Sequence, residues 1–123
     1  MSDAMSAFKA ALLKIQQAAD EHGTELRLSN EVLRPLDRLP PEIGSLTNLR
    51  VLDLSNTNIV DLEPITGLTN LQTLSLTATT VRDLTPVATL TKLRSLEFMF
   101  TEVADVEPLK GLFELQRLLL ADP

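Results

Sequence analysis

The chain of 123 residues contains no cysteine, no tryptophan and no tyrosine. The absence of cysteine excludes a disulfide, a thiolate nucleophile and a zinc–thiolate site, and with them the framework of a small secreted domain. Because only four phenylalanines are aromatic, the core must be built from aliphatic side chains, mostly leucine. The length and an apolar content of 44% are typical of one soluble globular domain.

A long apolar run and a cluster of lysine or arginine are also missing. Lys9 and Lys14 interrupt the apolar residues near the start, and no run is long enough to span a bilayer. We therefore expect a cytoplasmic protein with no membrane partner. The net charge is −6 and the acidic residues are scattered, so the sequence predicts no binding of nucleic acid.

The chain consists largely of a repeat of 22 residues. Residues 46–67 read LTNLRVLDLSNTNIVDLEPITG, residues 68–89 read LTNLQTLSLTATTVRDLTPVAT, and residues 90–111 read LTKLRSLEFMFTEVADVEPLKG. A partial unit, LFELQRLLLADP, follows at residues 112–123. Stacking the units predicts shared apolar columns. The columns are Leu49, Leu71, Leu93 and Leu115; Leu52, Leu74, Leu96 and Leu118; Leu54, Leu76, Phe98 and Leu120; Ile59, Val81 and Val103; Leu62, Leu84 and Val106; Ile65, Val87 and Leu109; and Leu68, Leu90 and Leu112.

Each unit changes from a strand-like to a helix-like spacing. Leu52 and Leu54 alternate with polar neighbours, as in a strand with one buried face. Pro64, Pro86 and Pro108 follow in their units, and proline favours the first position of a helical turn. No unit can bury its apolar face alone, so the units must stack. The expected fold is an α/β solenoid, with a parallel sheet on the concave side and short 3₁₀ or α turns on the convex side.

Two polar columns accompany the apolar ones. Thr57, Thr79 and Thr101 leave the strand, where a hydroxyl is expected to bond to the adjacent turn and form a polar ladder. The second column is Asp61, Asp83 and Asp105. It could be read as a calcium site, but each aspartate lacks a second carboxylate at ligand spacing. We favour the interpretation that these aspartates accept hydrogen bonds from backbone N–H groups before each helical turn, and we predict no metal site.

The pattern LxxLxLxxTxVxDLxPLxxL resembles the leucine-rich repeat family in its 22-residue form, as in internalin-like proteins and the phosphatase-1 regulatory subunit type. The resemblance runs from Leu46 to Leu120, with threonine where the family usually has asparagine in its ladder. It implies a curved sheet whose concave face binds other proteins. LPPEIGSL, within residues 24–45, is similar to a variant of longer bacterial repeats, so these residues are interpreted as an atypical first repeat with an enlarged loop at 30–38.

Residues 1–23 are predicted to form a helix that caps the solenoid. Phe8, Leu12, Ile15 and Ala19 recur at helical spacing, and Gly23 is placed to end the helix. A membrane-surface helix is disfavoured because the polar face mixes both charges, whereas a partner-binding helix stays open. His22, the single histidine, lacks catalytic partners. The whole chain, 1–123, is thus one domain of cap, first repeat, three full repeats (46–111) and a partial repeat.

Residues between the buried strand positions are expected to face outward. They are mostly small or charged and contain no nucleophile–base pair or metal triad. Apolar exceptions gather in the last two units. Met99 stands where earlier units have Ser55 and Thr77, and Phe113 stands where they have threonine. We predict these residues as partner-binding: Arg27, Asp53, Glu97, Met99, Phe100, Phe113, Arg117 and Leu119.

The last unit stops after its strand half, which predicts an uncapped C-terminal end that associates with a second copy, as a homodimer, or with a different protein. We therefore expect a non-catalytic module that binds a protein partner through the concave sheet face, the apolar C-terminal end, or both, without any cofactor. The alternative is a regulatory subunit or inhibitor that covers the active site of a partner enzyme. An enzyme is not expected, since a site would have to lie in the charged loop at 30–38.

Overall fold

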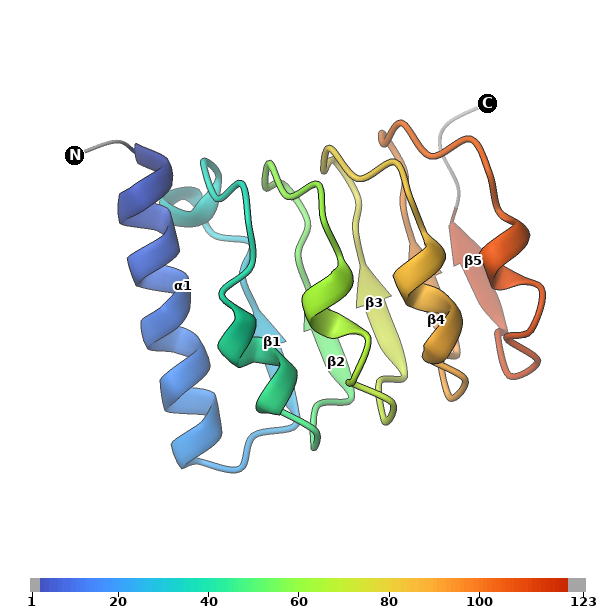
Figure 1. Ribbon diagram of the computed structural model, residues 1–123, viewed down its shortest axis with the longest axis horizontal. Helices are drawn as coiled ribbons and strands as arrows, with labels where there is room; N and C mark the ends of the chain where they lie inside the picture. The colour runs from blue at the N-terminus through green and yellow to red at the C-terminus, as the bar shows by residue number, and fades with distance from the viewer. Residues whose placement is uncertain (1–2, 120–123) are drawn as a thin grey trace.

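The chain folds as a solenoid of stacked coils with a helix at one end. The computed structural model describes residues 3–119, and the side chains of residues 3–116. Helix α1 (Asp3–Asp20) comes first, and the coils follow one another along the long axis of the molecule (Figure 1). Each coil contributes one strand to a five-stranded parallel sheet in the order β1-β2-β3-β4-β5. The strands are β1 (Glu25–Arg27), β2 (Val51–Asp53), β3 (Thr73–Ser75), β4 (Ser95–Glu97) and β5 (Arg117–Leu119).

The sheet register follows the repeat. Leu52 pairs with Leu74, and Leu74 pairs with Leu96, so residues 22 positions apart lie side by side. Leu26 pairs with Leu52 although 26 positions separate them. The four extra residues of the first repeat therefore bulge out of the coil without shifting the sheet.

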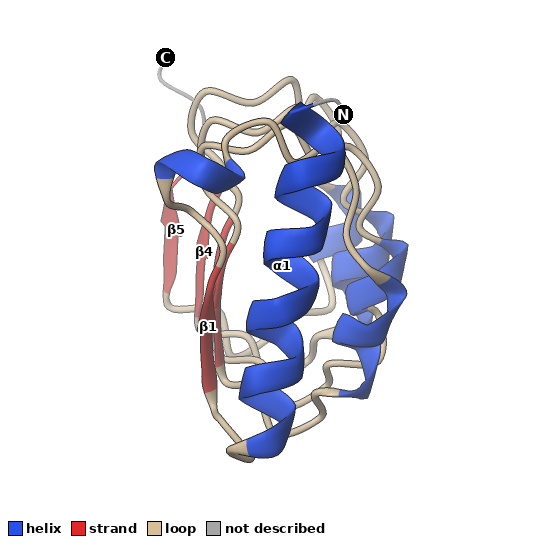
Figure 2. Cartoon of the chain, turned by 90° about the vertical axis from the view of Figure 1, so that its left-hand side faces the viewer, coloured by secondary structure: helices blue, strands red, loops and turns tan. Residues whose placement is uncertain are grey.

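Short 3₁₀ turns form the layer opposite the sheet. Figure 2, viewed from the α1 end, shows the strands on one side, these turns on the other, and α1 across the end between the two layers. The turns are η2 (Pro41–Ser45), η3 (Glu63–Ile65), η4 (Thr85–Thr89) and η5 (Glu107–Leu109), whereas η1 (Glu31–Leu33) lies on the strand side and packs on α1. The solenoid and its two kinds of layer were predicted from the repeat and are confirmed.

The proline and aspartate columns together account for the backbone N–H groups at the start of η3, η4 and η5, which have no partner within the turn. In η3 the proline is the second residue, one position later than predicted, because the turn begins at Glu63. The N–H of Glu63 donates to Asp61 Oδ1 (2.9 Å), Pro64 has no N–H, and the N–H of Ile65 donates to the carbonyl of Leu62 (3.0 Å). The same bonds begin η4 and η5. The aspartate column is therefore confirmed as a set of backbone acceptors.

The threonine column confirms the prediction only in part. The hydroxyl of Thr57 donates to the carbonyl of Leu54 (2.8 Å), and Thr79 and Thr101 bond in the same way to Leu76 and Phe98. Each hydroxyl thus bonds to a backbone carbonyl of the adjacent turn, as predicted, but it does so within its own coil, so the predicted ladder from coil to coil is not formed. The reason is that backbone groups already join the coils here, as in the bond from the N–H of Asn56 to the carbonyl of Thr77 (3.0 Å).

The predicted apolar columns fill the space between the layers. Leu49, Leu52, Leu74 and Leu96 are all fully buried. Burial weakens in the last full repeat, where Val106 is 49% exposed although Leu62 in the same column is 1% exposed. The convex half of that coil has no described coil stacked beyond it. Leu120 of the third column lies outside the described residues.

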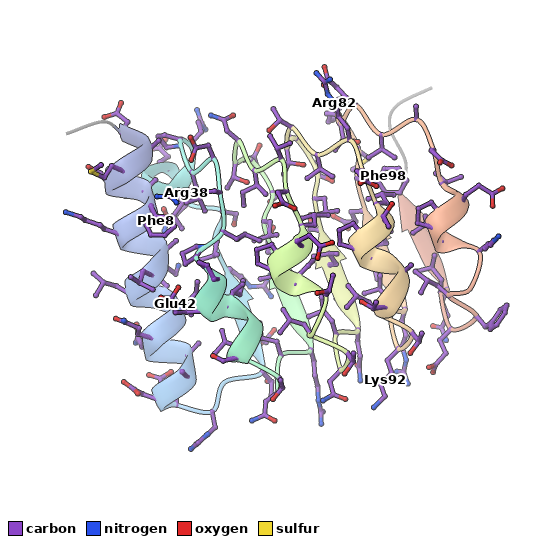
Figure 3. All side chains as sticks on the ribbon, viewed as in Figure 1. Phe8, Arg38, Glu42, Arg82, Lys92 and Phe98 are labelled. Carbon is purple, nitrogen blue, oxygen red and sulfur yellow. The ribbon has the colours of Figure 1, made fainter. Side chains whose placement is uncertain are left out.

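Helix α1 covers the first coil, but with a face other than the predicted one. The buried residues are Ala7, Ala11, Ile15 and Ala18. Ala19, predicted to be buried, is exposed, and Phe8 and Leu12 are half-buried. Small alanines let the helix axis approach the coil closely, so the bulky Phe8 lies at the margin. There the guanidinium of Arg38 stacks 4.3 Å from the ring centroid (Figure 3).

The loop at 30–38 is more ordered than a solvated turn. Asn30 caps η1 by accepting the N–H of Leu33 at its side-chain oxygen (3.1 Å). Leu33 and Leu36 are fully buried, and η1 packs on α1. The charged residues predicted in this loop are exposed. The extra residues thus complete the core beneath the capping helix.

A left-handed residue ends α1. His22, with φ 51°, directs its N–H to the carbonyl of Ala19 (3.2 Å), and Gly23 directs its N–H to the carbonyl of Ala18 (2.9 Å). These two bonds define a Schellman motif, in which glycine is the preferred left-handed residue. Here His22 occupies the left-handed position, and Gly23 follows one residue later.

Replacing His22 by glycine is therefore expected to stabilise the protein. Relief of the positive φ should raise the free energy of unfolding by about 1 kcal/mol, measured by urea denaturation. Glu21→Gly, one residue earlier and outside the left-handed position, is the control and should lower stability. A loss of stability in His22→Gly would contradict this account of the helix end.

Candidate functional site

The outward residues of the five strands form one open surface, called here the sheet face. Arg27, Asp53, Ser75 and Glu97 lie next to one another in register, and Leu119 continues the row. A second row runs from Glu25 through Val51, Thr73 and Ser95 to Arg117. The convex turns lie on the opposite side, so this side of the sheet is uncovered (Figure 2). The predicted outward rows are confirmed for the described side chains of β1 to β4.

Asp53 is the centre of a hydrogen-bond network on the sheet face. Its Oδ1 accepts the N–H (3.0 Å) and the hydroxyl (2.6 Å) of Ser55, and its Oδ2 accepts the hydroxyl of Ser29 (3.1 Å). Arg27 Nη1 lies 4.0 Å from the same Oδ2. Asp53 and Arg27 therefore lie together, as predicted, but much of the bonding capacity of Asp53 is used within the chain.

Glu97 occupies the same row two coils later. It is half-buried, and its Oε2 accepts the hydroxyl of Ser75 at 3.3 Å. One carboxylate oxygen thus has no hydrogen bond to residues 3–116. Glu97 is more accessible to a partner than Asp53 because it holds fewer internal bonds.

Phe100 is an exposed aromatic residue in a strained backbone position. It follows β4 with φ 56° and is 66% exposed. Asn56 and Ala78 occupy the same column at φ 59°, so the turn itself requires this conformation in each coil. Asparagine tolerates the left-handed region, whereas a bulky residue there costs about 1–2 kcal/mol. Sequence reasoning singled out Phe100 for its apolar side chain but did not find the strain.

Phe113 does not lie with Phe100. It is 92% exposed and precedes β5, whereas Phe100 follows β4. Because the strands are parallel, these two positions belong to opposite edges of the sheet. Both residues belong to the C-terminal end, but they do not form one apolar patch. The side chains of Arg117 and Leu119, predicted in the same site, lie outside the described part.

The described residues hold neither a cluster of metal ligands nor a helix that could span a membrane. No group of three or more histidine, aspartate or glutamate side chains within the described chain could hold a metal ion. Within residues 3–119, no helix has both the length and the apolar character needed to cross a bilayer.

The aspartate column has a measurable electrostatic signature at Asp83. Hydrogen bonds from the hydroxyl (2.6 Å) and the N–H (2.9 Å) of Thr85 lower the pKa of Asp83 from its ordinary value of 3.8. A lowered pKa in the folded state means that ionised Asp83 stabilises the fold above pH 3.8. This contribution is lost as the pH falls through the folded-state pKa.

We expect Thr85→Val to raise the pKa of Asp83 toward 3.8, because the larger of the two hydrogen-bond contributions disappears. The measurement is an NMR titration of the side-chain carboxyl carbon. Thr89→Val is the matched control, since that hydroxyl donates to the carbonyls of Thr66 and Pro86. An equal shift in both variants would show that Thr85 is not the cause.

A polar groove lies at the edge of the sheet where the strands begin. Its volume is about 400 Å³. Sequence reasoning missed it, because its residues precede the strands and belong to no apolar column. The signal available was the alternation of basic and amide residues in the segments LTNLR, LTNLQ and LTKLR. The lining residues are His22, Thr24, Asn48, Arg50, Asn70, Gln72 and Lys92.

Comparisons with known proteins agree with this architecture. The family model for leucine-rich repeats in two copies matches residues 47–89. Internalin C2 of Listeria monocytogenes is 30% identical, with a TM-score of 0.56 over 80% of this chain and 61% of that one. The internalin InlF of the same organism is 25% identical, with a TM-score of 0.50 over 74% of this chain and 34% of that one. The chain thus spans less than two thirds of either structure, and no protein of curated function matches it.

Leucine-rich repeat proteins generally mediate interactions between proteins and are typically non-catalytic. The 22-residue register, the parallel sheet with its 3₁₀ turns, and the family match all describe one architecture. The chain has the fold of a leucine-rich repeat solenoid, and its residues 47–89 match the family of leucine-rich repeats.

Proposed function

We propose that this protein is a non-catalytic recognition module that binds a protein partner through the sheet face and the neighbouring residues Met99 and Phe100. The observation that carries the proposal is Phe100, an aromatic side chain that is 66% exposed at φ 56°. Strain at an exposed residue without an internal packing gain is typical of a functional position. Aromatic residues are also the anchors that contribute most to protein interfaces.

The surroundings of Phe100 suit an interface. The sheet face presents mostly short side chains on a backbone fixed by the coil-to-coil hydrogen bonds. A preformed surface loses little conformational entropy when it binds. Met99, half-buried in the row of Ser55 and Thr77, adds an adaptable apolar contact beside the ring. Glu97, with its incompletely bonded carboxylate, supplies a polar contact in the same coil.

The experiment compares partner capture by the wild-type chain and by a Met99→Ser, Phe100→Asn double variant, with retained proteins quantified by mass spectrometry. Asn56 shows that asparagine fits this turn. Phe100→Asn should therefore raise the free energy of unfolding by about 1 kcal/mol. We expect the double variant to lose a specific partner while becoming no less stable.

Phe113→Thr is the matched control. It also removes an exposed ring, and threonine occupies this column at Thr47, Thr69 and Thr91. We expect it to retain the partner, because Phe113 lies at the opposite edge. The proposal would be wrong if every captured protein were retained equally by the wild type and the double variant.

We keep two further proposals from the sequence. The first is self-association: β5 pairs with β4, and no described strand pairs with the other edge of β5. Sedimentation velocity across micromolar concentrations tests this proposal, and a monomer throughout would exclude it. The second is a cytoplasmic location, which cell fractionation tests.

A further inference from the structure

The polar groove is lined by residues of the segments that precede the four strands β1 to β4. His22 and Thr24 lie before β1, Asn48 and Arg50 before β2, and Lys92 before β4. Figure 3 shows Lys92 at this edge and Arg82 at the opposite one. The groove is therefore separate from Met99 and Phe100, which follow β4 at the other edge.

The two edges of the sheet carry opposite charge. In residues 46–50, 68–72 and 90–94 every charged residue is basic, and the groove lining contains no carboxylate, although Glu21 and Glu114 lie at the same edge just outside the lining. These basic residues are Arg50, Lys92 and Arg94. At the other edge, every charged residue in 56–63, 78–85 and 100–107 is acidic except Arg82. The Nε of Arg82 lies 2.6 Å from Glu102 Oε2. Basic residues thus gather at one edge of a chain with a net charge of −6.

The basic groups of the groove lack carboxylate partners. Outside the groove, Arg27, Arg82 and Lys110 each lie within 4.0 Å of a carboxylate oxygen, whereas five other basic residues among residues 3–116 form no ion pair there. Within it, neither Arg50 nor Lys92 forms an ion pair with any residue of the described part of the chain. Their charge is therefore not neutralised within the described chain.

Lys92 is also held in position. Its Nζ donates to Asn70 Oδ1 (2.9 Å), and Asn70 Nδ2 donates to the carbonyl of Thr47 (2.9 Å). These bonds orient the ammonium group without neutralising it. A cation fixed in this way loses little entropy when it receives an anion.

We propose that the groove binds an acidic segment of a partner protein, through a carboxylate at Arg50 and a second one at Lys92. Arginine receives a carboxylate by two parallel hydrogen bonds. Two coil steps separate these residues, about 10 Å, which corresponds to about three residues of extended peptide. Gln72, in the coil between them, offers an amide group to the peptide backbone. Nucleic acid is disfavoured because a long polyanion would extend beyond the groove over a chain of net charge −6, whereas a short acidic segment contacts the groove alone.

The test uses an eight-residue peptide with Glu at every third position and Ser at the others, and the same peptide with Gln in place of Glu is the control. Binding is followed by NMR at low salt on the full chain. We expect shifts of the amides of residues 48–50 and 70–72 with the Glu peptide and none with the Gln peptide. The affinity should fall with added salt.

Each of the two groove variants introduces a residue that another coil carries at the same position, so the fold should be preserved. Arg50→Gln introduces the residue found at Gln72 and Gln116, and Lys92→Asn introduces the residue found at Asn48 and Asn70. Each should weaken peptide binding about fivefold. Lys110→Gln changes the net charge equally but lies on the convex side, and it should leave binding unchanged.

Three results would overturn the proposal: no binding, equal weakening by Lys110→Gln, or tighter binding of inorganic phosphate or an eight-nucleotide DNA than of the Glu peptide. The Phe100→Asn variant should bind the peptide as the wild type does. Failure of the groove and failure of the sheet-face proposal are therefore distinguishable.

Discussion

Replacing Leu74 by alanine is expected to lower the free energy of unfolding by about 3 kcal/mol. Leu74 is fully buried in the central strand β3 and pairs in register with Leu52 and Leu96. Truncation removes packing from three coils at once and leaves a cavity that the stacked backbone cannot close. Because small domains are stable by about 5–15 kcal/mol in total, the loss would be a large share.

Thr73→Ala is the control for this substitution. Thr73 is the preceding residue of the same strand, faces outward and is half-buried. Its truncation should cost less than about 1 kcal/mol. Urea denaturation followed by circular dichroism measures both variants. Similar losses for Leu74→Ala and Thr73→Ala would mean that the two faces of β3 are equally buried, contrary to the structure.

Ile15→Ala is expected to have the second large effect, a loss of about 3 kcal/mol. Ile15 is 1% exposed on the face of α1 that packs on η1, η2 and β1. The sequence left open whether this helix caps the solenoid or serves a partner. If α1 is a cap, burial of Ile15 adds to the free energy of unfolding of the isolated protein. If α1 instead packs only against a partner, Ile15 adds little to that free energy.

Leu13→Ala provides the comparison on the same helix. Leu13 is 66% exposed, and alanine is at least as good a helix former, so stability should change by less than about 0.5 kcal/mol. Denaturation of the isolated chain gives both values. Near-zero effects of both substitutions would show that α1 is not part of the folded core.

The fold could be predicted because one spacing repeats. Equal unit lengths place Leu52, Leu74 and Leu96 side by side, and a parallel sheet then follows from the need to bury them. The extra residues of the first repeat did not disturb this, because they lie between the strand and the convex turn. The packing of α1 could not be predicted from hydrophobicity, since the small size of Ala7 and Ala11 selected the face that meets the solenoid.

The candidate site could be predicted only in part. The outward rows follow from alternation in the strand, which requires no knowledge of the turns. The strain at Phe100 follows from the turn after the strand, and Ala78 in the same column gave no sign of a left-handed conformation. The bonds that occupy Asp53 come from Ser29 and Ser55, and their geometry depends on side-chain rotamers. The groove joins side chains from four coils and therefore requires coordinates.

The stacking of coils into a common interior is tested most directly by methyl–methyl NOEs in a leucine-labelled sample. Adjacent strands lie about 4.8 Å apart, so the methyl groups of leucines in one column are within NOE range. We predict cross-peaks from Leu74 to Leu52 and to Leu96, each 22 residues away. Cross-peaks from Leu74 confined to its own unit would contradict the solenoid and, with it, the sheet face and the groove.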